Sequence, residues 1–419
     1  MGLLRKLLQA LLPKPFYRAL VTGYHYLWAL GSAVWYGFPA KKLVVIGVTG
    51  TKGKSSVCEM LAACLEEDGK HVALSSTIRF KLGSTSDGNL YKMTLPGRGF
   101  LQSFLRNALK AHCTHAVVEL TSESAVQYRH SFTYLNALVF TNLAKEHIES
   151  HGGMENYFQA KYRLGDAVTR SPKRPRAIIA NADDAYGRRF LELSLEEKIG
   201  FSLTDVTDIV MENDGVAFTL DGVRFSLPHP GNFSILNALA AAKAARFLGV
   251  PLEVSAKALA KLSRIPGRAE KIEGGQNFLA VVDYAHTPDS LRALYSAYPS
   301  RRKICVLGNT GGGRDTWKRP EMGALAEEYC DEVILTNEDP YDEDPDAILA
   351  AMSSEMQKKP RVVMDRREAI KTALSLARVG DAVLITGKGT DPYIMGARGT
   401  RTPWSDARVV KDELEKLVS

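Results

Sequence analysis

A glycine-rich stretch near residue 50 has the residue types that bind a nucleotide phosphate. The segment GVTGTKGKSS (47–56) follows an apolar run and precedes a helix-like segment. Backbone N–H groups of such a loop and the following helix N-terminus bind an anion, a lysine adds positive charge, and a serine hydroxyl reaches Mg²⁺. The usual spacing requires glycine at 48, where this chain has Val48, and the glycines stand at 47, 50 and 53. The expected nucleotide-binding residues are Gly50, Thr51, Lys52, Gly53, Lys54, Ser55 and Ser56.

Four residues further along the chain have side chains suited to the same chemistry. Glu119 ends an apolar run, where a carboxylate can hold Mg²⁺ beside phosphates. His147 follows another such run, Lys161 stands in MENYFQAKYRLG, and Asp283 stands in VVDYAHTPDSL. Each has a structural alternative, because a strand-end acid, a lone histidine and a solvated lysine are common without function. Only their combination with the loop makes them candidates.

The elements around these residues predict an α/β fold. Apolar runs at 115–120, 136–143 and 176–183 are typical of buried parallel strands, and helix-length segments separate them. Residues 205–228 contain two Asp-Gly turns between short alternating runs, which predicts a small antiparallel meander. The sequence therefore predicts an ATP-binding domain with a mostly parallel sheet.

A second α/β unit is predicted in the C-terminal third. The predicted strands are the segments KICVLGN, DEVILTN, PRVVMD and DAVLITGKG, with helical patterns between them at 319–330 and 366–377. Glycine, proline and charge cluster at about 264–280. We expect a helical segment at 1–42, a central ATP-binding domain at 43–265 and a C-terminal Rossmann-like domain at 266–419.

Charge and cysteines limit the partners and the compartment. A net charge of +7 over 419 residues suits anionic small substrates or an anionic membrane surface as readily as nucleic acid. We expect no nucleic-acid partner. The five cysteines are scattered without a C-x-x-C pair, which is typical of a reducing compartment and argues against a zinc ribbon. An ATP site likewise favours the cytoplasm.

The N-terminal segment allows more than one interpretation. Residues 1–18 are basic and amphipathic, and 19–40 have no charged residue apart from a protonated His25. The length of 19–40 suffices for a membrane span, but its aromatic residues are spread along it and do not form two belts. A helix packed on the next domain and an interfacial helix at the inner face of a membrane both remain open. No cleavage site for a signal peptide precedes the domain.

Taken together in this order, the motifs resemble the Mur ligase superfamily, ATP-dependent amide ligases of peptidoglycan synthesis. The resemblance extends over nearly the whole chain after residue 43. The glycine loop has the family's shifted spacing, and VFTNLAKEHIESHGGMENYFQAK is similar to its strand–His–helix–Lys block. Later segments resemble family motifs too: GNFSILNALAA, PGRAEKI, VVDYAHTPDSL, GRDTWKRPEMG and LITGKG. TSESAVQYR resembles the muramoyl-contact segment of the MurE-type branch, which adds the third residue of the stem peptide.

The resemblance implies a mechanism and a set of ligands. ATP phosphorylates a carboxylate, an amine attacks the acyl phosphate, and amide, ADP and phosphate result. Ser55 and Glu119 are expected to hold one Mg²⁺, and His147 and a CO₂-derived carbamate on Lys161 a second. Lys54, Lys161 and His147 are the expected catalytic residues. Asn237 is expected near adenine, and Arg268 and Asp283 near phosphate and ribose.

The resemblance also implies two substrate sites. Thr94, Thr121, Gln127 and Arg129 are expected to contact the muramoyl peptide. Arg314 is expected to bind the α-carboxylate of the incoming amino acid. The side chain of that amino acid is expected to contact Glu338, Asp339, Tyr341 and Asp391. Diaminopimelate-adding members have D-N-P-R where this chain has Glu338–Tyr341, so the arginine is missing. An acidic pocket without this arginine suits L-lysine better than an amino acid with a distal carboxylate, unless Arg398 or Arg401 binds that carboxylate instead.

Other functions of the same family compete with this one. MurE-type enzymes have a uridine-binding domain before the glycine loop, and only 42 residues precede Leu43 here, so recognition of a UDP-linked acceptor is an open question. The alternatives are a MurT-like or folylpolyglutamate-like ligase and a non-catalytic ATP-binding scaffold at the membrane. A monomer is expected.

Overall fold

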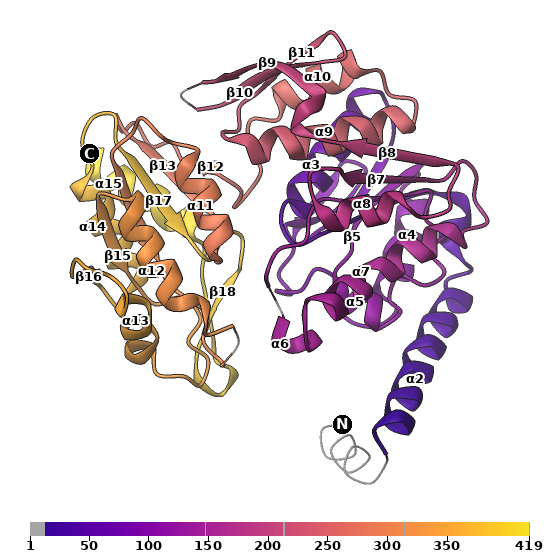
Figure 1. Cartoon of the computed structure of the whole chain (residues 1–419), viewed down its shortest axis with the longest axis horizontal. Coiled ribbons are helices and arrows are strands. Elements are labelled where there is room, and N and C mark those ends of the chain that lie inside the picture. Colours follow the sequence, from indigo (N-terminus) through magenta and orange to yellow (C-terminus); the bar gives the residue numbers. More distant parts are fainter. Residues whose placement is uncertain (1–12, 147, 213, 314, 419) are drawn as a thin grey trace.

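The computed structural model describes residues 13–146, 148–212, 214–313 and 315–418. They form two lobes, each built around its own sheet, and a helix that extends from the first lobe (Figure 1). We call the first lobe the central domain and the second the C-terminal domain. This arrangement confirms the predicted α/β fold.

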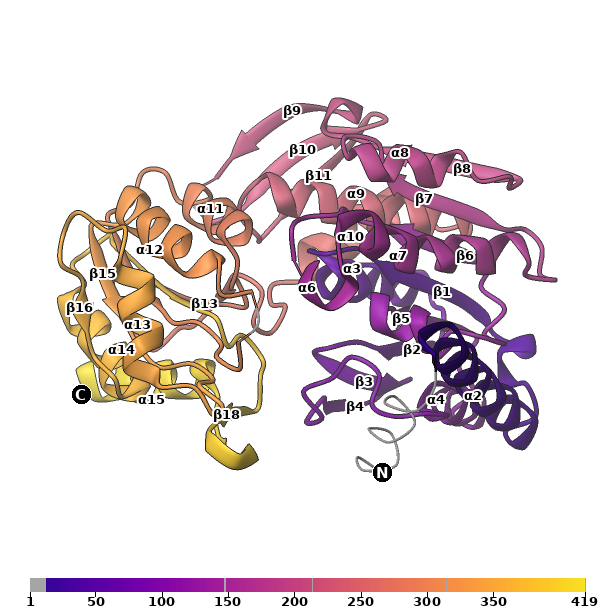
Figure 2. The same cartoon turned by 60° about the horizontal axis from the view of Figure 1, so that its bottom comes forward.

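The N-terminal helix α2 (Lys14–Trp35) lies beside α4 (Phe100–Lys110) of the central domain (Figure 2). Its buried side includes Ala29 and Ala33, and η1 (Pro39–Lys42) joins it to the first strand. Exposed large apolar side chains along α2 are Phe16, Leu20, Leu27, Trp28, Val34 and Trp35. None of the helices in the described ranges is long and apolar enough to cross a membrane.

The central domain contains an eight-stranded sheet that is parallel except at one edge. Its strands, in order across the sheet, are β4 (Thr85–Gly88), β3 (Arg79–Leu82), β2 (Val72–Ser75), β5 (His115–Glu119), β1 (Val44–Thr49), β6 (Ala137–Phe140), β7 (Ala177–Asn181) and β8 (Glu197–Phe201). The predicted strands at 115–120, 136–143 and 176–183 are β5, β6 and β7. The antiparallel edge of β3 and β4 was not predicted, because β4 (TSDG) is exposed and lacks an apolar pattern.

Helices cover both faces of this sheet, which is why its strands are apolar on both sides. Ile46 and Val48 of β1 belong to the core beneath α3 (Lys54–Glu67), α9 (Asn232–Phe247) and α10 (Leu252–Lys261). Val45 belongs to the opposite core beneath α4, α7 (Met154–Thr169) and α8 (Ala185–Leu191). Three short helices, α5 (Ser122–Val126), α6 (Ile148–His151) and η2 (Leu203–Asp205), lie in the connections.

The predicted meander is present. Strands β9 (Val206–Met211), β10 (Val216–Leu220) and β11 (Val223–Leu227) form a three-stranded antiparallel sheet. Phe218 and Phe225 stack across it with ring centroids 5.1 Å apart. Their burial against the α9–α10 side of the central core fixes the register of the meander.

The C-terminal domain contains a six-stranded sheet with one antiparallel edge strand. Its strands, in order across the sheet, are β12 (Glu270–Lys271), β13 (Leu279–Asp283), β17 (Ala382–Thr386), β14 (Lys303–Leu307), β15 (Glu332–Leu335) and β16 (Arg361–Val362). One core lies beneath α11 (Pro288–Ser296), α12 (Lys318–Tyr329) and α13 (Pro345–Ser353), the other beneath α14 (Arg366–Leu376) and α15 (Asp406–Val418). A ribbon of β18 (Tyr393–Met395), η3 (Ala397–Gly399) and β19 (Arg401–Pro403) extends from it.

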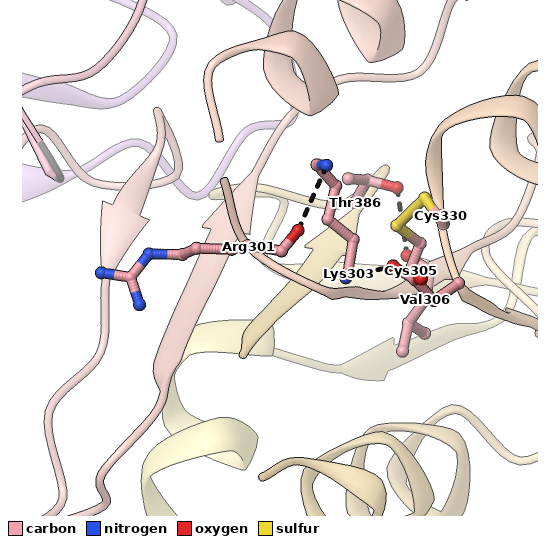
Figure 3. The surroundings of a disulfide bond; sticks show 7 residues. Arg301, Lys303, Cys305, Val306, Cys330 and Thr386 are labelled. Atoms are coloured by element: carbon pink, nitrogen blue, oxygen red, sulfur yellow. Dashed lines mark hydrogen bonds between the residues drawn. A yellow bond between two sulfur atoms is a disulfide. The ribbon is translucent and has the colours of Figure 1, made fainter. Parts of the chain in front are cut away.

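A disulfide in this domain contradicts the expected pattern of the cysteines. Cys305 of β14 and Cys330, directly after α12, are bonded to each other, with Cα atoms 6.2 Å apart (Figure 3). Cys58, Cys64 and Cys113 are free and buried. The spacing did not indicate the pair, because 25 residues separate the two cysteines and only the packing of α12 on the sheet brings them together.

Candidate active site

The glycine loop connects β1 to α3 as predicted, and two of its glycines have no room for a side chain. Gly53 has φ +80°, and a Cβ there would lie 2.3 Å from Asn237 Oδ1. A Cβ on Gly50 would lie 2.0 Å from Thr141 Oγ1. Helix α3 begins at Lys54 without a side-chain cap, so the N–H groups of its first turn are available to an anion.

The side chains of the loop are anchored from neighbouring elements. Thr51 Oγ1 lies 3.2 Å from Tyr157 Oη, and the Lys52 N–H donates to Asn142 Oδ1 at 2.9 Å. Lys54 Nζ donates to the Thr51 carbonyl at 2.9 Å. Burial lowers the pKa of Lys54, and the charges of Glu119 and Glu146 oppose that effect. The loop is therefore pre-formed, with a cation at its mouth.

Glu119 lies directly beside the loop, at the end of β5. Ser55 Oγ donates to Glu119 Oε2 at 2.9 Å. The Thr77 N–H and hydroxyl donate to the two carboxylate oxygens at 2.8 and 3.0 Å, and Thr77 Oγ1 lies 2.8 Å from Thr94 Oγ1. A hydroxyl and a carboxylate in contact beside a phosphate loop are oxygen donors of the kind that Mg²⁺ prefers. The residues present therefore fit such an ion.

Lys161 lies at the bottom of the same site. Only 1% of it is exposed, and Nζ donates to the Gly50 carbonyl at 2.7 Å and lies 4.6 Å from the Tyr157 ring centroid. Burial lowers the pKa of Lys161 well below its usual value of 10.5; the Lys54 charge lowers it further, and Glu146 and Glu119 raise it. Within the described ranges, no carboxylate lies at ion-pair distance from it. This environment therefore favours the neutral amine over the ammonium form.

The predicted muramoyl-contact residues gather on one side of the loop. Thr121 caps α5 by accepting from the Ser124 N–H at 3.1 Å. Arg129 donates to Gln127 Oε1 at 2.6 Å and to the Leu95 carbonyl, the residue after Thr94. These four predicted residues therefore belong to one connected surface, which runs from Glu119 toward α2.

The C-terminal domain reaches the glycine loop through Arg268. Its Nη2 donates to Ser55 Oγ at 3.3 Å, and its guanidinium stacks on Tyr284 at 4.6 Å from the ring centroid. Asp283 accepts from the Ala269 and Ala285 N–H groups, each at 2.6 Å. Burial raises the pKa of Asp283, although Arg268 and these N–H groups oppose it. Asp283 therefore fixes the turn that presents Arg268, and Asn237 faces Gly53 from the other side.

The predicted amine-substrate residues also come together, but their charges differ from the expectation of a free acidic pocket. Asp339 accepts from Lys388 Nζ and from the Met395 N–H, each at 2.8 Å, and its other oxygen accepts from Lys92. Asp391 lies 3.3 Å from Lys92 Nζ and 3.5 Å from Lys388 Nζ. Two ammonium groups of the chain itself therefore neutralise the two aspartates.

The other residues of this pocket are arranged around the same aspartates. Glu338 is buried, accepts from Thr310 Oγ1 at 2.7 Å, and packs against Gly387. The Tyr341 ring centroid lies 5.7 Å from Lys92 Nζ. Arg401 is exposed and stacks on Tyr393, so it does not replace the missing arginine of the pocket.

Two predicted residues, His147 and Arg314, lie outside the described residues. Within the described part of the chain there is no group of three His, Cys, Asp or Glu side chains that can hold a metal.

Three site residues were missed from the sequence. Glu146 lies 2.7 Å from His286 Nε2 and 3.1 Å from Lys52 Nζ, and so links the loop to the C-terminal domain. Lys92 and Lys388 fill the amine pocket. Lys388 stands in LITGKG, a segment already singled out, whereas Lys92 stands in an irregular loop without any motif.

Comparison with known proteins agrees with this geometry. Residues 48–245 match the family described as Mur ligase middle domain, and residues 267–389 match the Mur ligase, glutamate ligase domain. A UDP-N-acetylmuramyl-tripeptide synthetase of Roseiflexus sp. (strain RS-1) is 34% identical, over 92% of this chain and 81% of that protein. A UDP-N-acetylmuramoyl-L-alanyl-D-glutamate--2,6-diaminopimelate ligase of Caldanaerobacter subterraneus subsp. tengcongensis is 36% identical, over 90% of this chain and 80% of that protein.

Solved structures give the same result. One titled UDP-N-acetylmuramoyl-L-alanyl-D-glutamate--2,6-diaminopimelate ligase superposes with a TM-score of 0.61 at 29% identity, over 90% of this chain and 79% of that chain. Mycobacterium tuberculosis folylpolyglutamate synthase complexed with ADP superposes with a TM-score of 0.70 at 17% identity, over 87% of this chain and 92% of that chain. This similarity indicates a common fold. Because both family domains are present and a relative 34% identical is matched over 81% of its length, the chain belongs to the Mur ligase family and is an ATP-dependent amide ligase.

Proposed function

We propose that the enzyme adds a diamino acid, L-lysine in preference to meso-diaminopimelate, to a muramoyl-peptide carboxylate. One observation carries most weight: Arg268 of the C-terminal domain contacts Ser55 of the glycine loop, and Lys92 of the central domain contacts Asp339 of the amine pocket, so residues of both domains contribute to each site. A site built from two domains suits a reaction in which two substrates must meet a phosphoryl group.

The reaction has two steps. The carboxylate oxygen of the peptide attacks the γ-phosphorus of ATP, the bond to the β-bridging oxygen breaks, and ADP leaves. The amine nitrogen then attacks the acyl carbon, loses a proton, and expels inorganic phosphate to form the amide. Lys54, Arg268 and the loop N–H groups stabilise the negative charge that develops at the transferring phosphoryl group.

Ser55 and Glu119 would hold one Mg²⁺, which neutralises charge on the phosphates when bound. The second site is proposed at His147 and Lys161. The low pKa of Lys161 supports carbamylation, because only a neutral amine attacks CO₂; the product, a carbamate, is formed with release of one proton. A cationic side chain thus becomes an anionic oxygen ligand.

The acceptor is proposed to be a muramoyl peptide that Thr94, Thr121, Gln127 and Arg129 contact. Relatives named for UDP-N-acetylmuramoyl-L-alanyl-D-glutamate support this nucleotide-linked peptide as the first acceptor to test. The enzyme should release phosphate from ATP only when both this peptide and an amino acid are present. ATP hydrolysis that needs neither substrate would support a scaffold with residual ATPase activity instead.

The preference for L-lysine is supported by Tyr341, which stands where the relatives' D-N-P-R arginine is expected, and by Asp339 and Asp391. Lys388 balances one of these two carboxylates. A distal carboxylate that takes the place of Lys92 would be repelled by the other, whereas a distal ammonium would be paired with it. The test is kcat/KM for L-lysine and meso-diaminopimelate with the same acceptor. A tenfold or greater preference for diaminopimelate (roughly 1.4 kcal/mol) would refute the pocket assignment and leave the ligase assignment intact.

A peripheral contact of α2 with the inner face of the cytoplasmic membrane is proposed as well. The exposed side chains Leu27, Trp28 and Trp35 (83% exposed) are apolar, and exposed Lys41 and Lys42 follow them. Aromatic and basic groups together favour the interface of an anionic bilayer. Co-sedimentation with phosphatidylglycerol vesicles should exceed that with phosphatidylcholine vesicles and should fall for Leu27→Ser/Trp35→Ser. Equal binding of both vesicle types would contradict an attraction between the lysines and the anionic lipid. The expected monomer is a separate question, which light scattering of the full chain tests.

A further inference from the structure

Lys92 is presented to the amine pocket by a loop of the other domain. The loop lies between β4 and α4 and is organised by the buried Asn89, whose Nδ2 donates to the carbonyls of Ser76 at 3.1 Å and Met93 at 3.0 Å. The Tyr91 N–H donates back to Asn89 Oδ1 at 3.0 Å. Lys92 itself has φ +53°, a conformation that costs a non-glycine residue energy unless its surroundings enforce it. The loop is therefore built to direct this lysine.

The Lys92 ammonium group occupies the part of the pocket proposed for the substrate's side chain. Its Nζ donates to Asp339 Oδ2, lies 3.3 Å from Asp391, and lies 5.7 Å from the Tyr341 ring centroid. Two carboxylates and an aromatic face are the groups that recognise an alkylammonium ion. The structure thus contains an ammonium group bound in this pocket, and it comes from the chain itself.

The two aspartates of the pocket are balanced by one lysine from each domain. Lys388 is fully buried, donates to Asp339 Oδ1 and to the Tyr393 carbonyl at 2.7 Å, and is fixed in the domain that contains the pocket. Asp339 and Asp391 together bear two negative charges, of which Lys388 balances one. Lys92, whose side chain is 20% exposed and belongs to the other domain, balances the second.

We propose that Lys92 is a specificity-determining residue that fills the amine pocket until the distal ammonium of a substrate replaces it. This inference rests on the proposed function, because it assumes that the amine substrate binds here. Exchange of one cation for another keeps both aspartates paired. A neutral side chain that displaced Lys92 would leave a buried carboxylate unpaired, and a distal carboxylate would add a like charge. Selectivity thus arises from competition as well as from contact.

The first test measures the exposure of Lys92 without requiring turnover. The full chain is treated with a limiting amount of an acetylating reagent, and acetylation of Lys92 is quantified by mass spectrometry relative to exposed Lys110 of α4. This ratio cancels consumption of the reagent by free amino acids. L-Lysine should raise the ratio severalfold, whereas L-norleucine, which has the same chain length without the ammonium, should leave it unchanged. An unchanged ratio with L-lysine, or an equal rise with norleucine, would overturn the proposal.

The second test is kinetic. Lys92→Met keeps the apolar stem and removes the competing charge, so KM for L-lysine should fall about fivefold or more, because a pocket that is free only part of the time binds with an affinity reduced by that fraction. Lys110→Met, the matched control at an exposed position of α4, should leave KM for L-lysine unchanged. A rise in KM for L-lysine, or an unchanged KM, would overturn the proposal.

The two proposals can fail separately. Ligation of L-lysine without any change in Lys92 acetylation would refute the exchange and keep the function. Acetylation that responds to L-lysine in an enzyme that ligates no amino acid would keep the exchange and refute the proposed function.

Discussion

Two buried lysines in this molecule have opposite environments. Lys161, beneath the glycine loop, donates to a backbone carbonyl and lies over the Tyr157 ring, and burial lowers its pKa well below the usual value. Lys388, in the amine pocket, is ion-paired with Asp339 at 2.8 Å. Burial alone therefore does not determine the environment of a lysine: the surroundings of the first favour its neutral form, whereas the second is one half of a buried ion pair.

The largest effect is expected where the reactive lysine is removed. Lys161→Ala should lower kcat on the order of 10²–10³-fold or more, because the site loses its proposed anionic metal ligand. A high concentration of a short-chain carboxylate should restore part of the activity, measured as phosphate release with the muramoyl peptide. Near-normal activity of the variant would remove the carbamate from the mechanism.

The lysine at the mouth of the loop provides the next comparison. Lys54→Ala should lower kcat on the order of 10²-fold while the unfolding midpoint changes little, because Lys54 acts on charge that develops at the phosphoryl group. His147→Ala is expected to behave in the same way on the family resemblance alone. Carboxylates should not rescue Lys54→Ala; rescue there would show that the restoration seen with Lys161→Ala is nonspecific.

Replacement of Lys388 should lower the unfolding free energy much more than replacement of Lys161, the reverse of the order expected for activity. Lys388→Met leaves the buried Asp339 without its main partner and should cost about 3–5 kcal/mol in unfolding free energy. Lys161→Met removes an amine that has no carboxylate partner within the described residues, so its stability should equal or exceed that of the wild type. Urea denaturation measures both. Adding Asp339→Asn to Lys388→Met should recover part of the loss, and similar costs for the two single variants would contradict the comparison.

The smallest effect is a pH dependence. In the folded protein the pKa of Lys161 is below 10.5, so between the two values the unfolded chain binds more protons than the folded one. Stability therefore rises with pH across this window and does not depend on this group below the folded pKa or above the unfolded pKa. Wild type measured against Lys161→Met, in buffer free of CO₂, should gain up to about 1.4 kcal/mol per pH unit. A difference that does not change with pH would indicate that Lys161 is charged in the folded protein.

Much of the fold could be predicted because its signals are local. The buried strands β5, β6 and β7 are short apolar runs, and the meander is marked by its Asp-Gly turns. The edge strands β3 and β4 were missed, since the alternation in β3 (RFKL) extends over only four residues and β4 (TSDG) has no apolar side chain. The disulfide was missed for another reason: Cys305 and Cys330 are distant in sequence and meet only through the packing of α12.

By itself the sequence determined which residues could bind phosphate and where they stand, because a glycine loop between a strand and a helix is a local feature. It also indicated Glu119 and Lys161 through their places at a strand end and in a family motif. Only the tertiary structure decided the direction in which the pKa of Lys161 shifts and which side chains occupy the amine pocket. Both depend on groups far away in sequence: the backbone of Gly50 packs on Lys161, and Lys92 approaches Asp339 across the domain junction. Electrostatic free energies depend on burial and on distances in space, so they cannot be predicted from the spacing of residues along the chain.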